Sequence, residues 1–125
     1  MTDPLAADAG ARDVAAAVAA GRVSAIEVAQ AALARIARLD ARYNAFTAVT
    51  RERALAQAHE VEARRARGEA LPPLAGVPYA VKNLFDVRGL ATLAGSRLNA
   101  SREPAAGDAT LVTRLDAAGA VLVGA

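Results

Sequence analysis

Residues 74–89 read LAGVPYAVKNLFDVRG. A turn-forming glycine at the start of this stretch is followed by apolar residues that predict a short strand over 77–82. Because side chains alternate along a strand, Lys82 is expected to share a face with the small residues Pro78 and Ala80. Such a face removes water from an ammonium group and thereby favours the neutral amine.

Lys82 is the only lysine among the fifteen basic residues of the chain. The first interpretation of this residue is a general base, because a neutral amine can accept a proton. The second is an ion pair with Asp86, four residues later, which would hold the ammonium charged. The third is a strand-end lysine that reaches solvent along its aliphatic stem. The local sequence leaves all three open.

Two helices are expected before residue 43. The first covers 11–20, and the second begins at Ser24, because Ser24 and Glu27 have the spacing of a capping box. Apolar residues then recur at helical spacing and predict one buried stripe, formed by Val28, Ala29, Ala32, Leu33, Ile36 and Leu39.

Residues 43–68 predict a strand followed by a helix. The segment 43–49 is rich in β-prone residues, so a short strand is expected there. A helix over 51–66 follows, and Gly68 is a suitable residue to end it. His59 borders the apolar face of this helix and has no second histidine or cysteine beside it, so we expect a surface histidine rather than a ligand or a base.

The last part of the chain predicts a helix and a buried strand after irregular chain over 88–107. Asp108 is expected to cap the helix, with Leu111, Val112 and Leu115 facing inward. Residues 120–123 have the pattern of a strand buried on both faces. Strand, loop, helix and strand together predict an α/β fold built in layers. About three strands are few for a stable sheet, so we expect a truncated domain.

Composition excludes several kinds of site. The chain has no cysteine, which excludes disulfides, thiolate-held metals and a cysteine nucleophile, and no cofactor motif is present. Its net charge is only +2, and its arginines are spread along the chain and mixed with acidic residues, so we expect solvated helix faces and no nucleic-acid surface. No apolar run reaches the roughly 18 residues of a membrane span. The first residues lack the pattern of a secretory signal, so a cytoplasmic protein is expected.

Three ordered segments resemble the amidase signature family. Residues 74–96 carry its Gly-Val-Pro segment leading to Val-Lys, then Asp-Val-x-Gly, then Gly-Ser; residues 24–46 look like its opening helix, and residues 107–124 like its next helix–strand unit. The resemblance implies that residues 1–125 are the N-terminal portion of one amidase signature domain, with a mixed central sheet flanked by helices. Its expected parts are helical 1–42, a first strand and helix over 43–68, a lysine strand over 77–87 and a helix–strand unit over 108–124.

The resemblance also implies a chemistry. In this family a strand lysine, a cis-serine and a nucleophilic serine form the catalytic triad, and Lys82 matches the lysine. The two serines belong to a downstream Gly/Ser-rich segment, which none of Ser24, Ser96 and Ser101 matches. The family relationship thus implies an amidohydrolase that acts on non-peptide C–N bonds without a cofactor. These 125 residues by themselves are expected to be inactive.

Asn83 departs from the aspartate that most family members have after the lysine. Together with the following Leu-Phe-Asp-Val and the ending Val-Gly-Ala, it resembles the carboxybiuret hydrolase branch. That branch cleaves small linear or urea-like amides, and its members can associate with a small partner subunit; a homo-oligomer is the other expectation for partners. Two alternatives stay open: the glutaminase subunit of a tRNA-dependent amidotransferase, and a non-enzymatic Arg-rich helical binding module, which leaves the ordered motifs unexplained.

Overall fold

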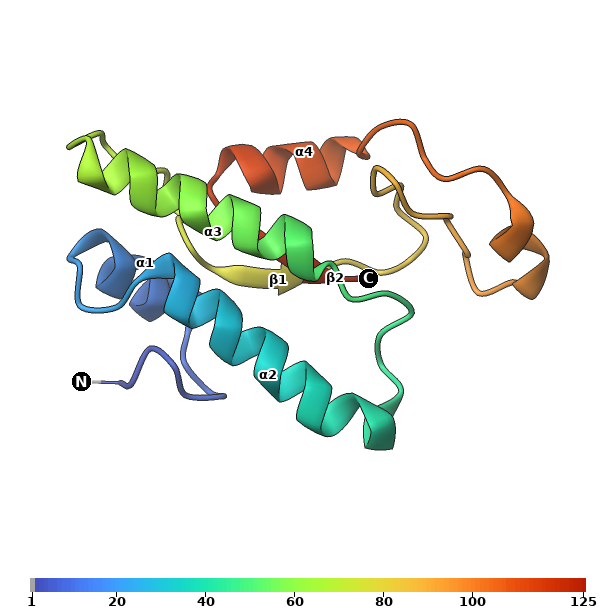
Figure 1. Cartoon of the computed structure of the whole chain (residues 1–125), viewed down its shortest axis with the longest axis horizontal. Helices are drawn as coiled ribbons and strands as arrows, with labels where there is room; N and C mark the ends of the chain where they lie inside the picture. Colours follow the sequence, from blue (N-terminus) through green and yellow to red (C-terminus); the bar gives the residue numbers. More distant parts are fainter. Residues whose placement is uncertain (1) are drawn as a thin grey trace.

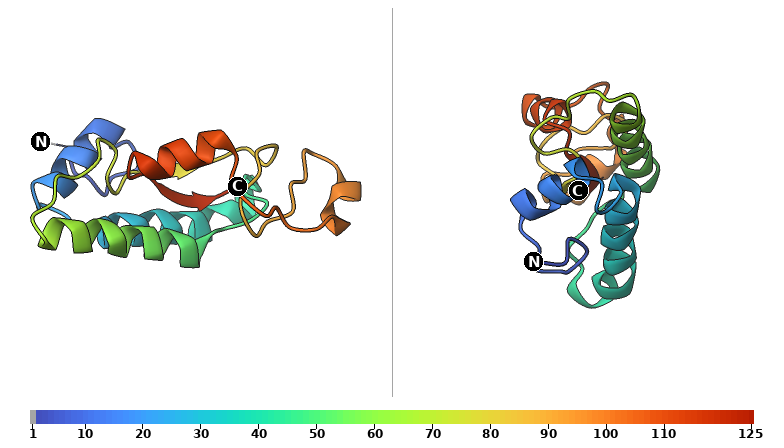
Figure 2. Two further views of the ribbon diagram at one scale, coloured as in Figure 1. Left: turned by 90° about the horizontal axis from the view of Figure 1, so that it is seen from above. Right: turned by 90° about the vertical axis from the view of Figure 1, so that its left-hand side faces the viewer.

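Helices lie on both sides of a short parallel sheet (Figure 1) in the computed structural model, which describes residues 2–125. The strands are β1 (Pro78–Ala80) and β2 (Val121–Gly124). The helices are α1 (Ala11–Ala19), α2 (Ala25–Tyr43), α3 (Arg51–Ala66) and α4 (Thr110–Ala117), with a 3₁₀ helix, η1 (Arg97–Ser101). Figure 2 shows α2 and α3 on one side of the strands and α4 on the other. The α/β layers expected from the sequence are confirmed.

The alternation of side chains along β2 divides the core into two parts. Val121 and Val123 point into a cluster formed with α1, α2 and α3, whereas Leu122 points to the opposite side and packs with Val112 of α4. All four residues of β2 are buried. A strand covered on both faces has no polar side to present, which explains why its sequence is an uninterrupted apolar run.

The start of α2 is set by local hydrogen bonds. Glu27 N donates to Ser24 Oγ at 3.0 Å, and Ser24 N donates to Glu27 Oε2 at 2.8 Å, so the predicted capping box is confirmed. Val28, Ala29, Ala32 and Leu33 are buried on one face of the helix, with Ile36 packed against them. Leu39, the last residue of the predicted buried stripe, is 36% exposed.

The strand predicted over 43–49 is wrong. Residues 44–50 instead form irregular chain alongside β2, with one isolated antiparallel bridge between Val49 and Gly124. The carboxylate of Asp40 explains the difference, because its Oδ1 accepts from Ala45 N at 2.7 Å and from Phe46 N at 3.2 Å. Backbone donors taken up by a side chain cannot join a ladder of strand hydrogen bonds.

The prediction that Asp108 caps the fourth helix is also wrong. The N-cap residue of α4 is Ala109, without a side-chain cap. The Asp108 carboxylate accepts instead from both terminal nitrogens of Arg53, at 2.9 and 2.8 Å. Both partners of this bidentate pair are charged, whereas a cap would bond the carboxylate to a neutral backbone N–H. The buried face of α4 also differs from the predicted one. Val112 is fully buried as expected, but Leu115 is half-buried and Leu111 is 42% exposed.

Arg53 joins three elements through a partly buried polar network. Its guanidinium bonds Asp108 and also Asp116 of α4, at 2.5 Å, while Tyr79 Oη donates to Asp116 Oδ1 at 3.0 Å. Arg53 lowers the pKa of the Asp108 carboxyl below its ordinary 3.8, chiefly by hydrogen bonding. Burial and the hydrogen bond to Asp116 raise the pKa of the Tyr79 hydroxyl. The network therefore attaches α3 to α4 and to the strand that leads to Lys82.

Replacing Arg53 with methionine is expected to destabilise the full-length protein by about 1–3 kcal/mol, because two partly buried carboxylates lose their counter-charge. Arg64→Met is the control, since its ion pair with Glu69 is exposed and should contribute less than about 0.5 kcal/mol. Denaturant unfolding at neutral pH measures both. Because the Asp108 pKa is lowered in the folded state, its contribution is present at neutral pH and is lost as pH falls through that folded value. Equal losses in the two variants would contradict the prediction.

Candidate active site

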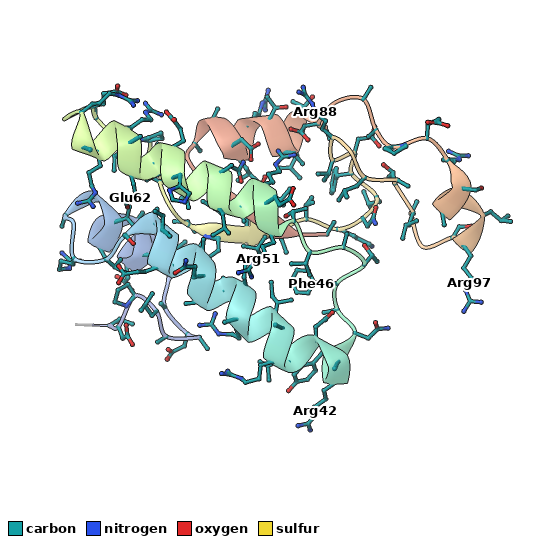
Figure 3. All side chains as sticks on the ribbon, viewed as in Figure 1. Arg42, Phe46, Arg51, Glu62, Arg88 and Arg97 are labelled. Carbon is teal, nitrogen blue, oxygen red and sulfur yellow. The ribbon has the colours of Figure 1, made fainter. Side chains whose placement is uncertain are left out.

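Lys82 lies in a cleft at the carboxyl ends of β1 and β2. The cleft has a volume of about 440 Å³, and it is lined by the segment 45–47, by residues 80–83, by Gly95 and by Ala125. Because the strands are parallel, their carboxyl ends meet at one edge of the sheet, which is where ligands bind in many α/β proteins. Phe46, labelled in Figure 3, marks the wall contributed by the irregular chain between α2 and α3.

The main chain around Lys82 is held firmly. Val81 N donates to Gly124 O at 3.1 Å, so the residue before the lysine is still bonded to β2. The carbonyl of Lys82 accepts from Leu84 N at 2.8 Å and from Phe85 N at 3.1 Å. This tight turn ends the strand before the lysine. The strand predicted over 77–82 is therefore shorter, and of the expected lysine strand 77–87 only Pro78–Ala80 is strand.

The side chain of Lys82 is free within residues 2–125. Pro78 is half-buried, but Ala80 and Lys82 are exposed, so residues 2–125 do not form the water-poor face that the strand pattern predicts around Lys82. The pairing with Asp86 is wrong: Asp86 Oδ1 accepts from Thr92 Oγ1 at 2.5 Å, and the ion pairs among the described residues do not include Lys82. Because the backbone at Lys82 is anchored and its amine has no partner among residues 2–125, the amine is available to bond a group that binds in the cleft.

Asn83 connects the walls of this cleft. Its Oδ1 accepts from Leu93 N at 3.0 Å, and its carbonyl accepts from Ala94 N at 2.7 Å. Its Nδ2 donates to Thr47 Oγ1 at 2.7 Å, and that hydroxyl donates to Ala125 O at 2.9 Å. The residue next to Lys82 thus bonds two segments, one 10 and one 36 residues away in the sequence.

One of these walls is a strained turn. Ser96 N donates to Leu93 O at 2.9 Å, and the two central residues have positive φ, 46° at Ala94 and 74° at Gly95. Positive φ at both central residues is typical of a type I′ turn, which favours glycine or asparagine at these positions. An alanine in the left-handed region costs roughly 1–2 kcal/mol. The surrounding bonds must hold Ala94 in place, and Asn83 makes one of them.

The remaining candidates in the sequence are structural. Ser24 belongs to the capping box, Ser96 Oγ accepts from Leu98 N at 3.3 Å, and Ser101 Oγ donates to Leu98 O at 3.3 Å, so none of the serines lines the cleft. His59 is exposed on α3, as expected. Over residues 2–125 no group of three metal-ligating side chains forms, and no helix there is long and apolar enough to cross a bilayer.

The arginines do not form a single basic surface. Figure 3 shows Arg42, Arg51, Arg88 and Arg97 on separate parts of the molecule. The run at 64–67 is neutralised locally by ion pairs with Glu60, Glu62 and Glu69. The prediction of solvated helix faces is confirmed for this run.

Sequence reasoning missed Thr47 and the role of Asn83. The only sign of Asn83 in the sequence is that it stands where most members of the family have an aspartate after the lysine. Its partner Thr47 lies 36 residues away. Thr47 belongs to a segment predicted to be a strand, where a threonine needs no special explanation. No local signal connects the two residues.

Comparison with known proteins agrees with this architecture. The chain is 60% identical over 107 residues to the AtzE subunit of 1-carboxybiuret hydrolase from Pseudomonas sp. (strain ADP), covering 86% of this chain and 23% of that protein. It is 49% identical over 114 residues to a glutamyl-tRNA(Gln) amidotransferase subunit of Salinispora tropica, covering 91% of this chain and 23% of that protein. It therefore spans about a quarter of the length of these curated relatives.

Solved structures show the same fold. A structure of a vestigial protein complex that bears on the evolutionary origins of an s-triazine catabolic enzyme superposes with a TM-score of 0.89 at 57% identity, over 90% of this chain and 24% of that one. The native peptide amidase of Stenotrophomonas maltophilia gives 0.85 at 36% identity, over 94% and 24%. The expected fold, the N-terminal part of the amidase signature architecture, is confirmed. The family model named Amidase matches residues 27–125, so this chain belongs to the amidase family.

Proposed function

We propose that this chain is the lysine-bearing N-terminal portion of an amidohydrolase that cleaves a C–N bond of a small linear or urea-like amide. The observation that carries the proposal is the position of Lys82, the only lysine of the chain, in a cleft at the carboxyl ends of the two strands. The turn after Lys82 and the bond from Val81 N to Gly124 O hold its backbone, and its side chain is exposed and unpaired within residues 2–125.

In the proposed mechanism the neutral amine of Lys82 is the base. It accepts a proton from a bridging serine, which in turn takes the proton of a second, nucleophilic serine. The nucleophile attacks the amide carbonyl, and backbone N–H groups stabilise the oxyanion that forms. The proton returns along the same route to the nitrogen of the leaving ammonia or amine as the C–N bond breaks. Water then hydrolyses the acyl-enzyme, and no cofactor takes part.

Two substrate classes compete. The 60% identity to a 1-carboxybiuret hydrolase favours a urea-like amide. The amidotransferase relatives, at 46% to 51% identity, keep the glutaminase reaction as the second candidate. Both groups of relatives are named as subunits, so we include a partner protein in the proposal and place a small partner before a homo-oligomer. The scattered arginines and locally paired charges support neither a nucleic-acid surface nor an Arg-rich binding module, and a cytoplasmic location remains part of the proposal.

Ammonia release by the full-length protein tests the substrate class. We expect turnover of a carboxylated biuret with kcat/KM at least about tenfold above that for glutamine, because discrimination by a few placed polar contacts is worth more than about 1.4 kcal/mol. The assay is run with and without a co-expressed partner protein. Faster turnover of glutamine would favour the amidotransferase reaction. Failure to hydrolyse any member of a panel of small amides would overturn the proposal.

A further inference from the structure

We propose that Asn83 is a positioning residue for Lys82: it holds the two walls of the cleft in register beside the lysine without adding a charge there. The inference rests on the proposed role of Lys82 as the base. Asn83 does not have to touch the substrate, since its contacts are with the protein chain on either side of the cleft.

Asn83 reaches both walls with one side chain. The carboxamide oxygen holds Leu93 N at 3.0 Å, at the start of the strained turn that carries Gly95. The carboxamide nitrogen holds Thr47 Oγ1 at 2.7 Å, on the wall formed by residues 45–47. A carboxamide has a donor end and an acceptor end, so it can bond two such different partners at once.

Within residues 2–125 no other side chain bonds both of these walls. The turn at 93–96 is in an unfavourable left-handed conformation and depends on bonds from outside it. The chain over 44–50 is bonded to the end of β2, through Thr47 N and Ala48 N to Ala125 O at 2.7 and 3.1 Å, but these bonds do not connect it to the turn at 93–96. Loss of the carboxamide would leave Leu93 N without its acceptor and Thr47 Oγ1 without its donor. The two walls would then lose the bond that joins them to each other beside Lys82, while Thr47 N stays bonded to Ala125 O and Ala94 N to the Asn83 carbonyl.

Charge distinguishes asparagine from aspartate at this position. An aspartate could still accept from Leu93 N, but it could bind Thr47 only if that hydroxyl turned away from Ala125 O. It would also place a negative charge beside the ammonium, which favours the protonated lysine. Among the described residues lining the cleft Lys82 is the only ionisable side chain, and the nearby Asp86 is bound by Thr92. A charge introduced at 83 is therefore expected to act on Lys82 directly.

The test uses the full-length enzyme with Asn83→Ala, Asn83→Asp and the control Asn99→Ala. Asn99 also bonds the turn, through Leu93 O at 2.8 Å, but it forms no hydrogen bond with Asn83 or Thr47 among the described residues. Asn83→Ala should lower kcat about 10- to 100-fold with KM nearly unchanged, as expected when a reacting group is misplaced by about 1 Å. Asn83→Asp should recover most of kcat at high pH, with the acidic limb of the pH–rate profile moved to higher pH. Asn99→Ala should keep kcat within about twofold, since Leu93 N and Ala94 N stay bonded to Asn83.

A second set of measurements separates positioning from general stability. Asn83→Ala is repeated in the Lys82→Ala background, where it should change the residual rate by less than about twofold if it acts through the lysine. The inference would be overturned if Asn83→Ala lowered the residual rate of Lys82→Ala by the same roughly 10- to 100-fold factor. It would also be overturned by a change in KM alone, or by equal losses of kcat in Asn83→Ala and Asn99→Ala. Wild-type turnover by Lys82→Ala alone would instead overturn the proposed function. The two failures are therefore distinguishable.

Discussion

Lys82→Ala is expected to lower kcat/KM of the full-length enzyme by at least about 1,000-fold, because the nucleophile loses the base that accepts its proton. Lys82→Arg is expected to lose as much, since a guanidinium stays protonated and cannot act as a base. The arginine variant keeps the positive charge, so it separates proton transfer from simple charge attraction. Trapping of the acyl-enzyme with hydroxylamine, together with the initial release of ammonia, measures the step that should fail.

The fold should survive both changes. Lys82 is exposed and forms no ion pair within residues 2–125, so truncating it should alter the free energy of unfolding by less than about 0.5 kcal/mol. Arg97→Ala, an exposed cation on η1 outside the cleft, is the matched control and should keep full activity. Substantial acylation by Lys82→Ala would show that another group is the base.

Leu122→Ala is expected to have the largest effect on stability, a loss of about 3–5 kcal/mol in the free energy of unfolding. Leu122 is completely buried, at 0% exposure, at the centre of β2, and it packs with Val81, Val87 and Val112. A small side chain there leaves a cavity that close-packed neighbours cannot fill without moving the strand. Because Val81 precedes Lys82 and belongs to the same cluster, the activity should fall together with the stability.

Leu111→Ala is the control for the leucine truncation. Leu111 is on α4, next to the buried Val112, but 42% of it is exposed. Its removal should cost less than about 1 kcal/mol, since a large part of the side chain is already in contact with water in the folded protein. Denaturant unfolding of the two full-length variants compares them directly. A loss at Leu111 as large as that at Leu122 would contradict the assignment of these two residues to the surface and the core.

Much of the fold could be predicted where the cause is local. The capping box at Ser24 needs two residues three positions apart, and the bounds of α3 follow from periodicity and from Gly68. The buried strand at the end of the chain is evident from its unbroken apolar run. The position of Lys82 as a candidate base follows from its motif. The capping box depends on bonds between residues a few positions apart. The apolar run of β2 predicts burial whatever elements cover the strand.

Other features depend on which partner a polar side chain takes in the folded chain. Asp108 has the residue type of a helix cap, but Arg53 lies 55 residues away and binds it more strongly. The segment 43–49 has the composition of a strand, but Asp40 takes up its first donors. The carboxylates of Asp108 and Asp40 can each bond several kinds of donor, and residue types alone do not show which donor each one takes.

The helices, the buried strand and the family motif around Lys82 can be read from the amino-acid sequence, because they follow from spacing along one chain. That Lys82 leaves the strand on an exposed turn, and that Asn83 joins Thr47 to the turn at Leu93, follows only from the folded chain. Hydrogen bonds between distant segments depend on how the layers pack, and packing is a property of the whole fold rather than of any local pattern.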